Sequence, residues 1–234
     1  METIDMDEWH RIISEQVIFP IVSFDAAVDR LKLMNFTATN TELTAPILED
    51  TSLFSGYVKN SLATDGAKYG IGGYDEHRTV YSRSRVFDAK QGEAPRRIHL
   101  GVDIWGEVDT EIFCPLDGVV HSFTFNDHFG DYGATIILQH QINGIDFHTL
   151  YGHLSLKDIE GLKEGQFIAG GSLLAHFGSS PENGQWPPHL HFQIIYDMEG
   201  QKGDYPGVCS IDKRNYYLNN CPDPDAILGF MKYL

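Results

Sequence analysis

Residues 189–195 have the sequence HLHFQII, in which polar and apolar side chains alternate as far as Ile194. A period of two is typical of a β-strand that turns one face toward a core. Such a strand places the imidazoles of His189 and His191 on one face, about 6.6 Å apart. That distance is too wide for a direct hydrogen bond. At this distance one imidazole can bind a metal ion while the other contacts a group that is bound to the same ion.

The chain around this strand, from about residue 97 onward, has the texture of antiparallel β-sheet. Short apolar runs such as 112–120 and 135–138 are separated by Gly, Asn and Asp. Asn143-Gly144 predicts a tight hairpin, because both turn positions tolerate positive φ. We therefore expect a mainly β domain, with a predominantly antiparallel sheet, over residues 95–200.

Residues 1–94 predict a helical N-terminal segment, which makes the whole chain α+β. Apolar residues recur at helical spacing, and Ser23 is a candidate helix cap. The glycine-containing stretch 66–73 should end the third of these helices. Residues 201–234 are expected to form an ordered C-terminal tail packed on the β domain. The predicted helices cover residues 9–17, 24–31, from 51 to about 62, and 75–85.

The composition excludes several partners. The 234 residues carry 17 Lys plus Arg against 33 Asp plus Glu, a formal net charge of −16 that would repel nucleic acid. No apolar run is long enough to span a bilayer. The N-terminal residues lack the pattern of a signal peptide, so we expect a cytoplasmic protein, unless another route exports it to the periplasm or cell wall. Three dispersed cysteines suggest reduced, structural thiols.

A second histidine motif, His99-Leu100-Gly101-Val102-Asp103, adds a carboxylate. Along a straight strand His99 and Asp103 would lie about 13 Å apart, too far to share one ion at bond lengths of about 2.0–2.2 Å. The chain must therefore bend, and Gly101 permits the bend. Together with one further histidine, His99 and Asp103 form a set of nitrogen and oxygen ligands that is suited to zinc. A fourth position stays open for water. An open position indicates catalysis.

Three blocks of the sequence resemble the signature motifs of the lysostaphin/LytM-type zinc metallopeptidases, which cut peptide bonds in bacterial peptidoglycan. The blocks are residues 99–104 (HLGVDI), 151–155 (YGHLS) and 188–192 (PHLHF). The resemblance covers about residues 97–195. It implies that zinc is held by His99, Asp103 and His191, and that the catalytic imidazoles are those of His153 and His189.

The absence of another zinc-peptidase motif agrees with catalysis by histidines. The chain has no H-E-x-x-H, so the glutamate base of many zinc peptidases is absent. A histidine must then handle the proton, for which an ordinary pKa near 6.5 is suitable. We expect His153 and His189 to share two roles, deprotonating the water and stabilising or protonating the tetrahedral intermediate. Which residue has which role stays open.

The expected function is therefore zinc-dependent hydrolysis of peptide bonds, in peptidoglycan-type peptides by resemblance. Two alternatives remain: a cytosolic zinc hydrolase of a soluble amide or peptide, and a non-catalytic zinc-binding regulatory protein. The expected partner is a peptide or amide substrate, such as a peptidoglycan fragment.

Two further features leave alternatives open. Tyr132, in the turn 130–133, either lines the substrate groove or packs at a hairpin end. The segment 69–74 (YGIGGY) is either a mobile connector or a gate across the zinc cleft, with Asp75, His77 and Arg78 nearby. The remaining histidines are expected to be structural or surface residues: His10, His77, His121, His128, His140, His148 and His176.

Overall fold

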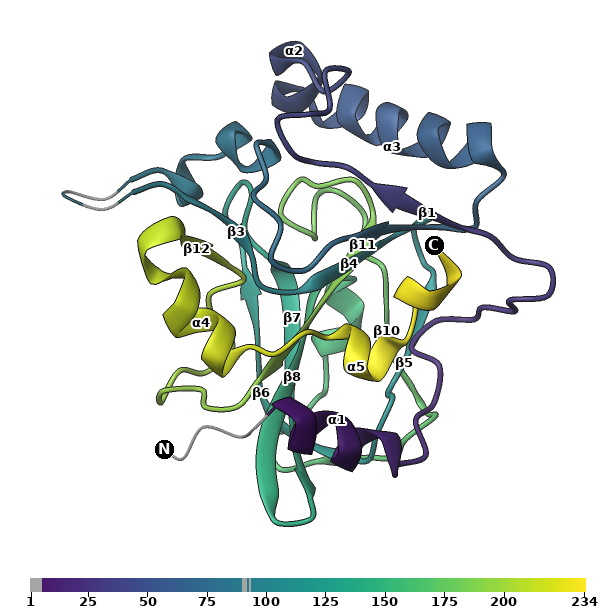
Figure 1. Ribbon diagram of the computed structural model, residues 1–234, viewed down its shortest axis with the longest axis vertical. Coiled ribbons are helices and arrows are strands. Elements are labelled where there is room, and N and C mark those ends of the chain that lie inside the picture. The colour runs from purple at the N-terminus through teal and green to yellow at the C-terminus, as the bar shows by residue number, and fades with distance from the viewer. Residues whose placement is uncertain (1–5, 90–91, 93) are drawn as a thin grey trace.

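The computed structural model describes residues 6–89, 92 and 94–234. Its centre is an eight-stranded sheet with the order β1-β2-β4-β11-β8-β7-β6-β9 (Figure 1). All of its pairs are antiparallel except β1 with β2. The strands of this sheet are β1 (Leu31–Met34), β2 (Tyr69–Gly72), β4 (Val102–Trp105), β6 (Gly118–Asn126), β7 (Gly133–Ile142), β8 (Ile145–Leu154), β9 (Phe167–Ile168) and β11 (His189–Ile195).

Two small antiparallel ladders and several helices flank this sheet. The ladders join β5 (Glu111–Phe113) to β10 (Leu173–His176) and β3 (Arg96–His99) to β12 (Val208–Ser210). The α-helices are α1 (Met6–Ser14), α2 (Ala45–Glu49), α3 (Thr51–Asp65), α4 (Arg214–Asn220) and α5 (Asp225–Leu228). Short 3₁₀ turns cover Val80–Arg83, Arg85–Phe87, Leu156–Ile159, Ile211–Lys213 and Met231–Tyr233. The predicted mainly β, antiparallel fold with additional helices is confirmed.

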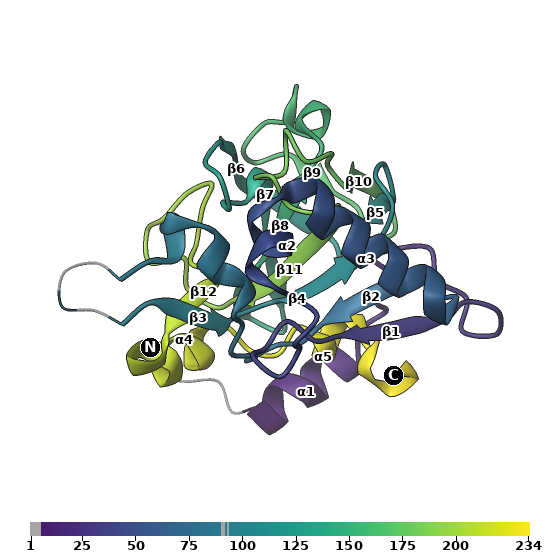
Figure 2. The same cartoon turned by 90° about the horizontal axis from the view of Figure 1, so that it is seen from above.

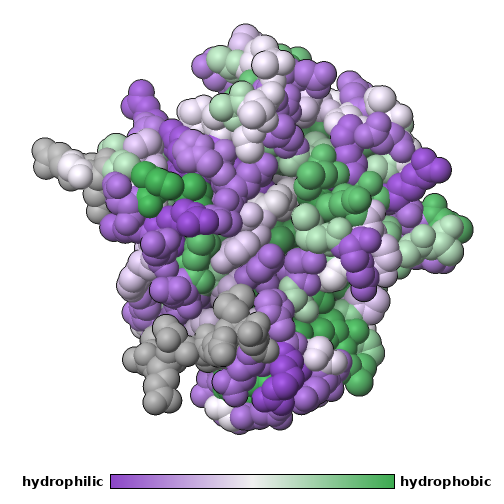
Figure 3. Space-filling view, in the orientation of Figure 1, coloured by the Kyte–Doolittle hydropathy of each residue, from purple (hydrophilic) through white to green (hydrophobic). Residues whose placement is uncertain are grey.

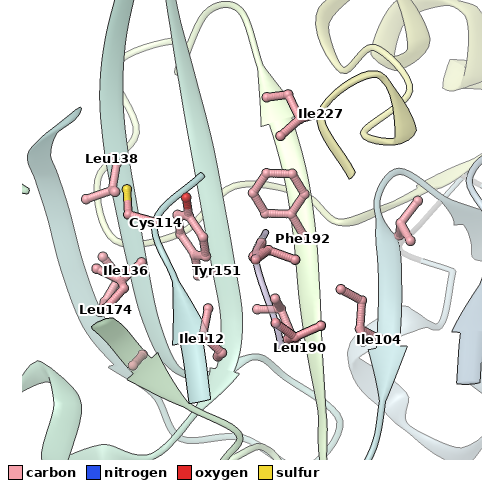
Figure 4. Packing of buried hydrophobic residues seen from close by; sticks show 14 of the residues in the cluster. Ile104, Ile112, Cys114, Ile136, Leu138, Tyr151, Leu174, Leu190, Phe192 and Ile227 are labelled. Carbon is pink, nitrogen blue, oxygen red and sulfur yellow. The ribbon is translucent and has the colours of Figure 1, made fainter. Parts of the chain in front are cut away.

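Strand β11 has the alternation that its sequence predicts. Leu190, Phe192 and Ile194 belong to the main hydrophobic core, whereas His189, His191 and Gln193 occupy the intervening positions. Figure 4 shows Leu190 and Phe192 packed among side chains of the neighbouring strands, with Ile227 of α5 at one end. Both faces of β11 are buried, so the histidine face is covered by other parts of the protein.

Helix α3 begins and ends as its sequence predicts. The carboxylate of Asp50 accepts hydrogen bonds from the amides of Ser52 and Leu53, and Gly66 ends the helix with φ of 59°. Its buried face packs over β1 and β4 in a second hydrophobic cluster. Helix α1 packs on the main core at the opposite end of the molecule, next to α5 (Figures 1 and 2).

The helix predicted for residues 24–31 is wrong. Asp25 caps its own turn by accepting a hydrogen bond from the amide of Ala27, and Val28 is exposed. Such local side-chain bonds compete with helix formation. The chain instead extends into the edge strand β1, which pairs with β2.

The prediction for residues 69–85 also needs correction. Residues 69–72 form β2, a buried strand between β1 and β4, rather than a connector. In place of a helix over 75–85, His77 bridges Ile98 of β3 and two 3₁₀ turns follow. Glycines at positions 70 and 72 let Met34 and Arg78 approach the strand more closely than a Cβ would allow.

The sheet crosses the predicted boundary between residues 94 and 95, because β1 and β2 join strands of the β domain. The division of the chain at residues 94 and 200 stays a prediction. No helix in the described ranges is both long and apolar enough to cross a bilayer. The surface in Figure 3 is largely hydrophilic, with an apolar area at the C-terminal end, where Met231, Tyr233 and Leu234 are exposed.

Candidate metal centre and catalytic cavity

His99, Asp103 and His191 bring three ligand atoms together. His99 lies at the end of β3, and Asp103 of β4 pairs directly with His191 of β11. The Nε2 atom of His99 lies 3.0 Å from Nδ1 of His191 and 3.2 Å from Oδ1 of Asp103. The third side of this triangle, from His191 Nδ1 to Asp103 Oδ1, is 3.1 Å. All three residues are buried, and in the described chain they form the one three-residue group with metal-ligand spacing.

The hydrogen bonds around this triangle fix which nitrogen of each imidazole faces it. Nδ1 of His99 donates to the carbonyl oxygen of Gly73 at 2.9 Å. Nε2 of His191 donates to Oε1 of Gln193 at 3.0 Å, and the amide nitrogen of Gln193 is directed to the carbonyl of Pro206. In the neutral imidazoles, the nitrogens inside the triangle therefore carry lone pairs.

Three acceptors thus face one another, because the carboxylate oxygen carries no proton. Its pKa is lowered well below the ordinary value: burial opposes ionisation, but the adjacent imidazole of His99 and the guanidinium of Arg78 outweigh it. A cation bound among these three acceptors would remove the repulsion between their lone pairs. Ligands about 2.0–2.1 Å from a tetrahedral ion are separated from one another by about 3.3 Å, close to the triangle's sides. The residues fit zinc, which they would hold with room for one further ligand.

Gly101 allows His99 and Asp103 to meet, as the sequence predicts. It lies between β3 and β4, where the chain passes from one ladder to another sheet. A Cβ atom at this position would lie 2.6 Å from Cε1 of His191 and 2.7 Å from the carbonyl oxygen of Phe192. The position therefore requires glycine because both a ligand imidazole and a backbone carbonyl approach it.

His153 and His189 form a second pair beside the triangle. His153 is on β8 and His189 on β11, strands that are neighbours in the sheet. The Nδ1 of His153 donates to the carbonyl of Asn183, and that of His189 donates to the carbonyl of Pro187, each at 2.8 Å. Within the described chain neither Nε2 has a hydrogen-bond partner, so both are available as acceptors. His153 has φ of 64°, a conformation that is uncommon for a residue with a side chain.

Burial keeps these imidazoles neutral. It lowers the pKa of His189 to about 4 and that of His99 to about 4. The pKa of His153 falls well below its ordinary value, first through burial and then through the neighbouring imidazole of His189, because two protonated rings would repel each other. Neutral imidazoles are the forms that bind a metal or accept a proton.

A cavity of about 240 Å³ adjoins these groups. His153, His189, His191 and Asp103 line it, and none of the eight other histidines among the described residues does. The lining also includes Val80, Tyr81, Val86 and Phe87 from the N-terminal part of the chain, and Trp105, Trp186, Tyr205 and Val208. The indole of Trp105 stacks on His189, with centroids 3.8 Å apart.

Tyr132 lines the cavity and packs near His191 and His153. Its ring lies 5.1 Å from that of His191 and 5.6 Å from that of His153. Its hydroxyl donates to the carbonyl of Tyr205 and lies 3.5 Å from Nε2 of His191. Burial raises the pKa of this phenol well above its ordinary value, so it stays a donor. A contact with substrate stays a prediction.

Two residues contact the metal ligands in the structure but were not predicted to do so from the sequence. Gln193 accepts from His191, and the alternation that placed His189 and His191 on one face could have identified it as the next residue on that face. Arg78 contacts Asp103 and was noted only as a neighbour of a possible gate. No local pattern connects Arg78 to Asp103, because β2 and β4 bring them together.

The part of the chain that holds this site is similar to known peptidases. Residues 97–204 match the family described as Peptidase family M23. An L-Ala–D-Glu endopeptidase of Bacillus subtilis (strain 168) is 31% identical over 147 residues, which are 59% of this chain and 43% of the relative. The chain thus covers less than half the length of that relative.

The sequence identity to solved structures is lower. Lysostaphin from Staphylococcus simulans matches with a TM-score of 0.42 and 22% identity, over 69% of this chain and 50% of the other. A zinc-containing peptidase from Vibrio cholerae matches with a TM-score of 0.36 and 23% identity, over 52% of this chain and 31% of the other.

Proposed function

Since residues 97–204 match peptidase family M23, whose members are zinc-dependent, we propose that this protein is a zinc metalloendopeptidase acting on peptidoglycan-type peptides. In this proposal His99, Asp103 and His191 hold the ion, and His153 and His189 are the catalytic imidazoles. The observation that carries it is the convergence of three ligand atoms, 3.0–3.2 Å apart, beside a cavity lined by two further imidazoles whose Nε2 atoms have no hydrogen-bond partner among the described residues.

The ion and the histidine side chains have separate roles in the proposed hydrolysis. Zinc, when bound, would polarise the scissile carbonyl and make a water molecule more acidic. The Nε2 atom of His153 or His189 accepts the proton of that water, because each Nδ1 is already committed to a backbone carbonyl. The protonated imidazole then becomes the donor for the leaving amine. The stacked pair holds one proton more easily than two, because two imidazolium rings so close together would repel each other.

The peptide substrate is supported by the named relative. The curated Bacillus subtilis protein is an L-Ala–D-Glu endopeptidase. By analogy we propose a peptide bond of a peptidoglycan stem peptide as the scissile bond here. The cavity of about 240 Å³ and the burial of all five site residues favour a short peptide over an extended polymer.

The test is hydrolysis of defined substrates followed by mass spectrometry. The protein loaded with one zinc equivalent is incubated with synthetic stem peptides, soluble peptidoglycan fragments and intact cell walls. Metal-free protein and the His153→Ala variant are the controls. We expect new amino termini from peptides only with the loaded, unsubstituted protein. Zinc binding without cleavage of any of these substrates would contradict the proposal and favour a regulatory protein.

A second candidate is a cytosolic hydrolase of soluble peptides unrelated to the wall. The formal charge of −16 favours it, because an anionic wall would repel this chain. The same experiment separates the two candidates when a library of ordinary L-peptides is included. Cleavage of the library without cleavage of stem peptides would support this second candidate.

A further inference from the structure

We propose that Arg78 is a positioning residue that confines Asp103 to one ligand oxygen and so keeps a coordination position open. The inference rests on the metal site of the proposed function. Arg78 lies outside residues 97–204, the part of the chain that matches the family. It reaches the site because β2 pairs with β4, and the chain after β2 turns back over Asp103.

The two oxygens of Asp103 have different partners. Oδ1 faces Nε2 of His99 and Nδ1 of His191, so it belongs to the ligand triangle. Oδ2 accepts a hydrogen bond from Nη1 of Arg78. The guanidinium is buried, and its charge stands beside the oxygen that a bidentate carboxylate would offer to the ion.

The guanidinium is fixed on its other sides. Nε donates to Oε2 of Glu76 at 2.7 Å, and Nη2 donates to the carbonyl oxygen of Gly73 at 3.1 Å. That carbonyl also accepts from Nδ1 of His99 at 2.9 Å. Residues 73–78 therefore orient two of the three ligands at once.

Gly72 provides the space for this arrangement. It pairs with Asp103 across the sheet, and a Cβ at its position would lie 2.6 Å from Nη2 of Arg78 and 3.3 Å from Cβ of Asp103. Gly72→Ala should therefore push the guanidinium away from the carboxylate without removing its charge. This substitution supplies a second way to disturb the same contact.

Loss of the contact has a defined consequence. A carboxylate with both oxygens unpaired can bind a metal ion through both, as it does in many sites. The second oxygen would then raise the coordination number of the ion above four and crowd the position that a catalytic zinc site leaves open. Partners in the outer shell of a metal site contribute about 10–100-fold to affinity or activity.

The experiment replaces zinc with cobalt(II), whose visible absorption reports coordination number and geometry. The variants are Arg78→Met, Arg78→Lys and Gly72→Ala in the full chain. The matched control is Arg214→Gln, which breaks the ion pair of Arg214 with the carboxylate of Asp75 in the same segment, a pair that does not include a side chain of the ligand triangle. Spectra at one cobalt equivalent, zinc affinity by chelator competition, and kcat and KM are measured for each.

We expect Arg78→Met and Gly72→Ala to lose the intense absorption of four-coordinate cobalt while still binding the ion. In both, kcat should fall by about 10–100-fold, with a smaller change in KM. Arg78→Lys, which keeps a charged donor, should restore the spectrum, and Arg214→Gln should match the unsubstituted protein.

An unchanged cobalt spectrum in folded Gly72→Ala or Arg78→Met would overturn the inference, even if stability or activity fell. If Arg78→Met does not fold, Gly72→Ala and Arg78→Lys decide: an altered spectrum in the first and a normal one in the second are required. Failure of the unsubstituted protein to bind one equivalent of zinc or cobalt would instead refute the proposed function.

Discussion

The imidazole rings of His153 and His189 stack face to face, with centroids 4.0 Å apart and planes inclined by 29°. They come from the neighbouring strands β8 and β11, and each donates its Nδ1–H to a backbone carbonyl. The two rings are therefore oriented by the main chain and not by each other. Both present Nε2 as an acceptor to the cavity, which is the arrangement that a two-histidine proton relay needs.

Replacing either ring should stop turnover without removing the metal. In His153→Ala and His189→Ala we expect kcat to fall by about 10²–10⁴-fold, the usual contribution of general acid–base catalysis. Zinc content, measured by atomic emission, should stay near one per chain, because neither residue belongs to the ligand triangle. Exposed His128→Ala is the control. Full activity in both variants would refute the catalytic roles.

Gln193 should contribute to metal affinity through His191. Its Oε1 accepts the Nε2–H of the ligand imidazole and so fixes the tautomer that binds the ion. We expect Gln193→Ala to weaken zinc binding by about 10–100-fold in chelator competition. Gln139→Ala, at an exposed position of β7, should leave the affinity unchanged. Equal affinities in the two variants would show that the hydrogen bond does not support the ligand.

Gly101→Ala should disrupt the site locally. The new Cβ would meet the imidazole of His191 and the carbonyl of Phe192, so we expect about 1–3 kcal/mol of destabilisation and at least about 10-fold weaker zinc binding. Gly56→Ala is the matched control, because nothing lies within 4 Å of its Cβ in helix α3. It should be neutral or stabilising by up to about 1 kcal/mol in urea unfolding. Unchanged zinc affinity in Gly101→Ala would show that the close packing is not needed for the ligand geometry.

His140 should make stability depend on pH. Burial lowers its pKa to about 4, while the unfolded chain has an ordinary value of 6.5. Between these values the unfolded state binds the proton and the folded state does not, so stability is complete above pH 6.5 and is lost as the pH falls toward 4. The loss reaches about 3 kcal/mol at most.

The comparison is the free energy of unfolding of His140→Gln and of the unsubstituted protein from pH 7 to 4. We expect a shallower loss in the variant, because its residue 140 does not titrate. His128→Gln, at an exposed position, should keep the original slope. Parallel slopes for His140→Gln and the unsubstituted protein would contradict the assignment.

Much of the fold could be predicted where local and tertiary preferences agree. The alternation in β11 identified the face that carries His189 and His191, and the period of α3 with the glycine-containing stretch after it identified that helix. Gly101 was correctly identified as the residue at which the chain bends. In each case the pattern on which the prediction rested lies within a few residues of sequence.

The wrong predictions arise where partners distant in sequence decide the conformation. Residues 69–72 contain two glycines and lack a strand pattern, yet they form β2 because β1 and β4 pair with them on both sides. The apolar spacing in 24–31 suggested a helix, but local Asp hydrogen bonds and pairing with β2 favour a turn and a strand. Arg78 was not identified as a partner of Asp103 for the same reason.

The central claim is that one zinc ion lies among His99, Asp103 and His191. The most direct test is a crystal structure of the zinc-loaded protein with diffraction recorded above and below the zinc absorption edge. We predict a single strong anomalous peak within about 2.0–2.2 Å of His99 Nε2, Asp103 Oδ1 and His191 Nδ1. A loaded protein with no peak at this triangle, or with its zinc bound elsewhere, would contradict the claim.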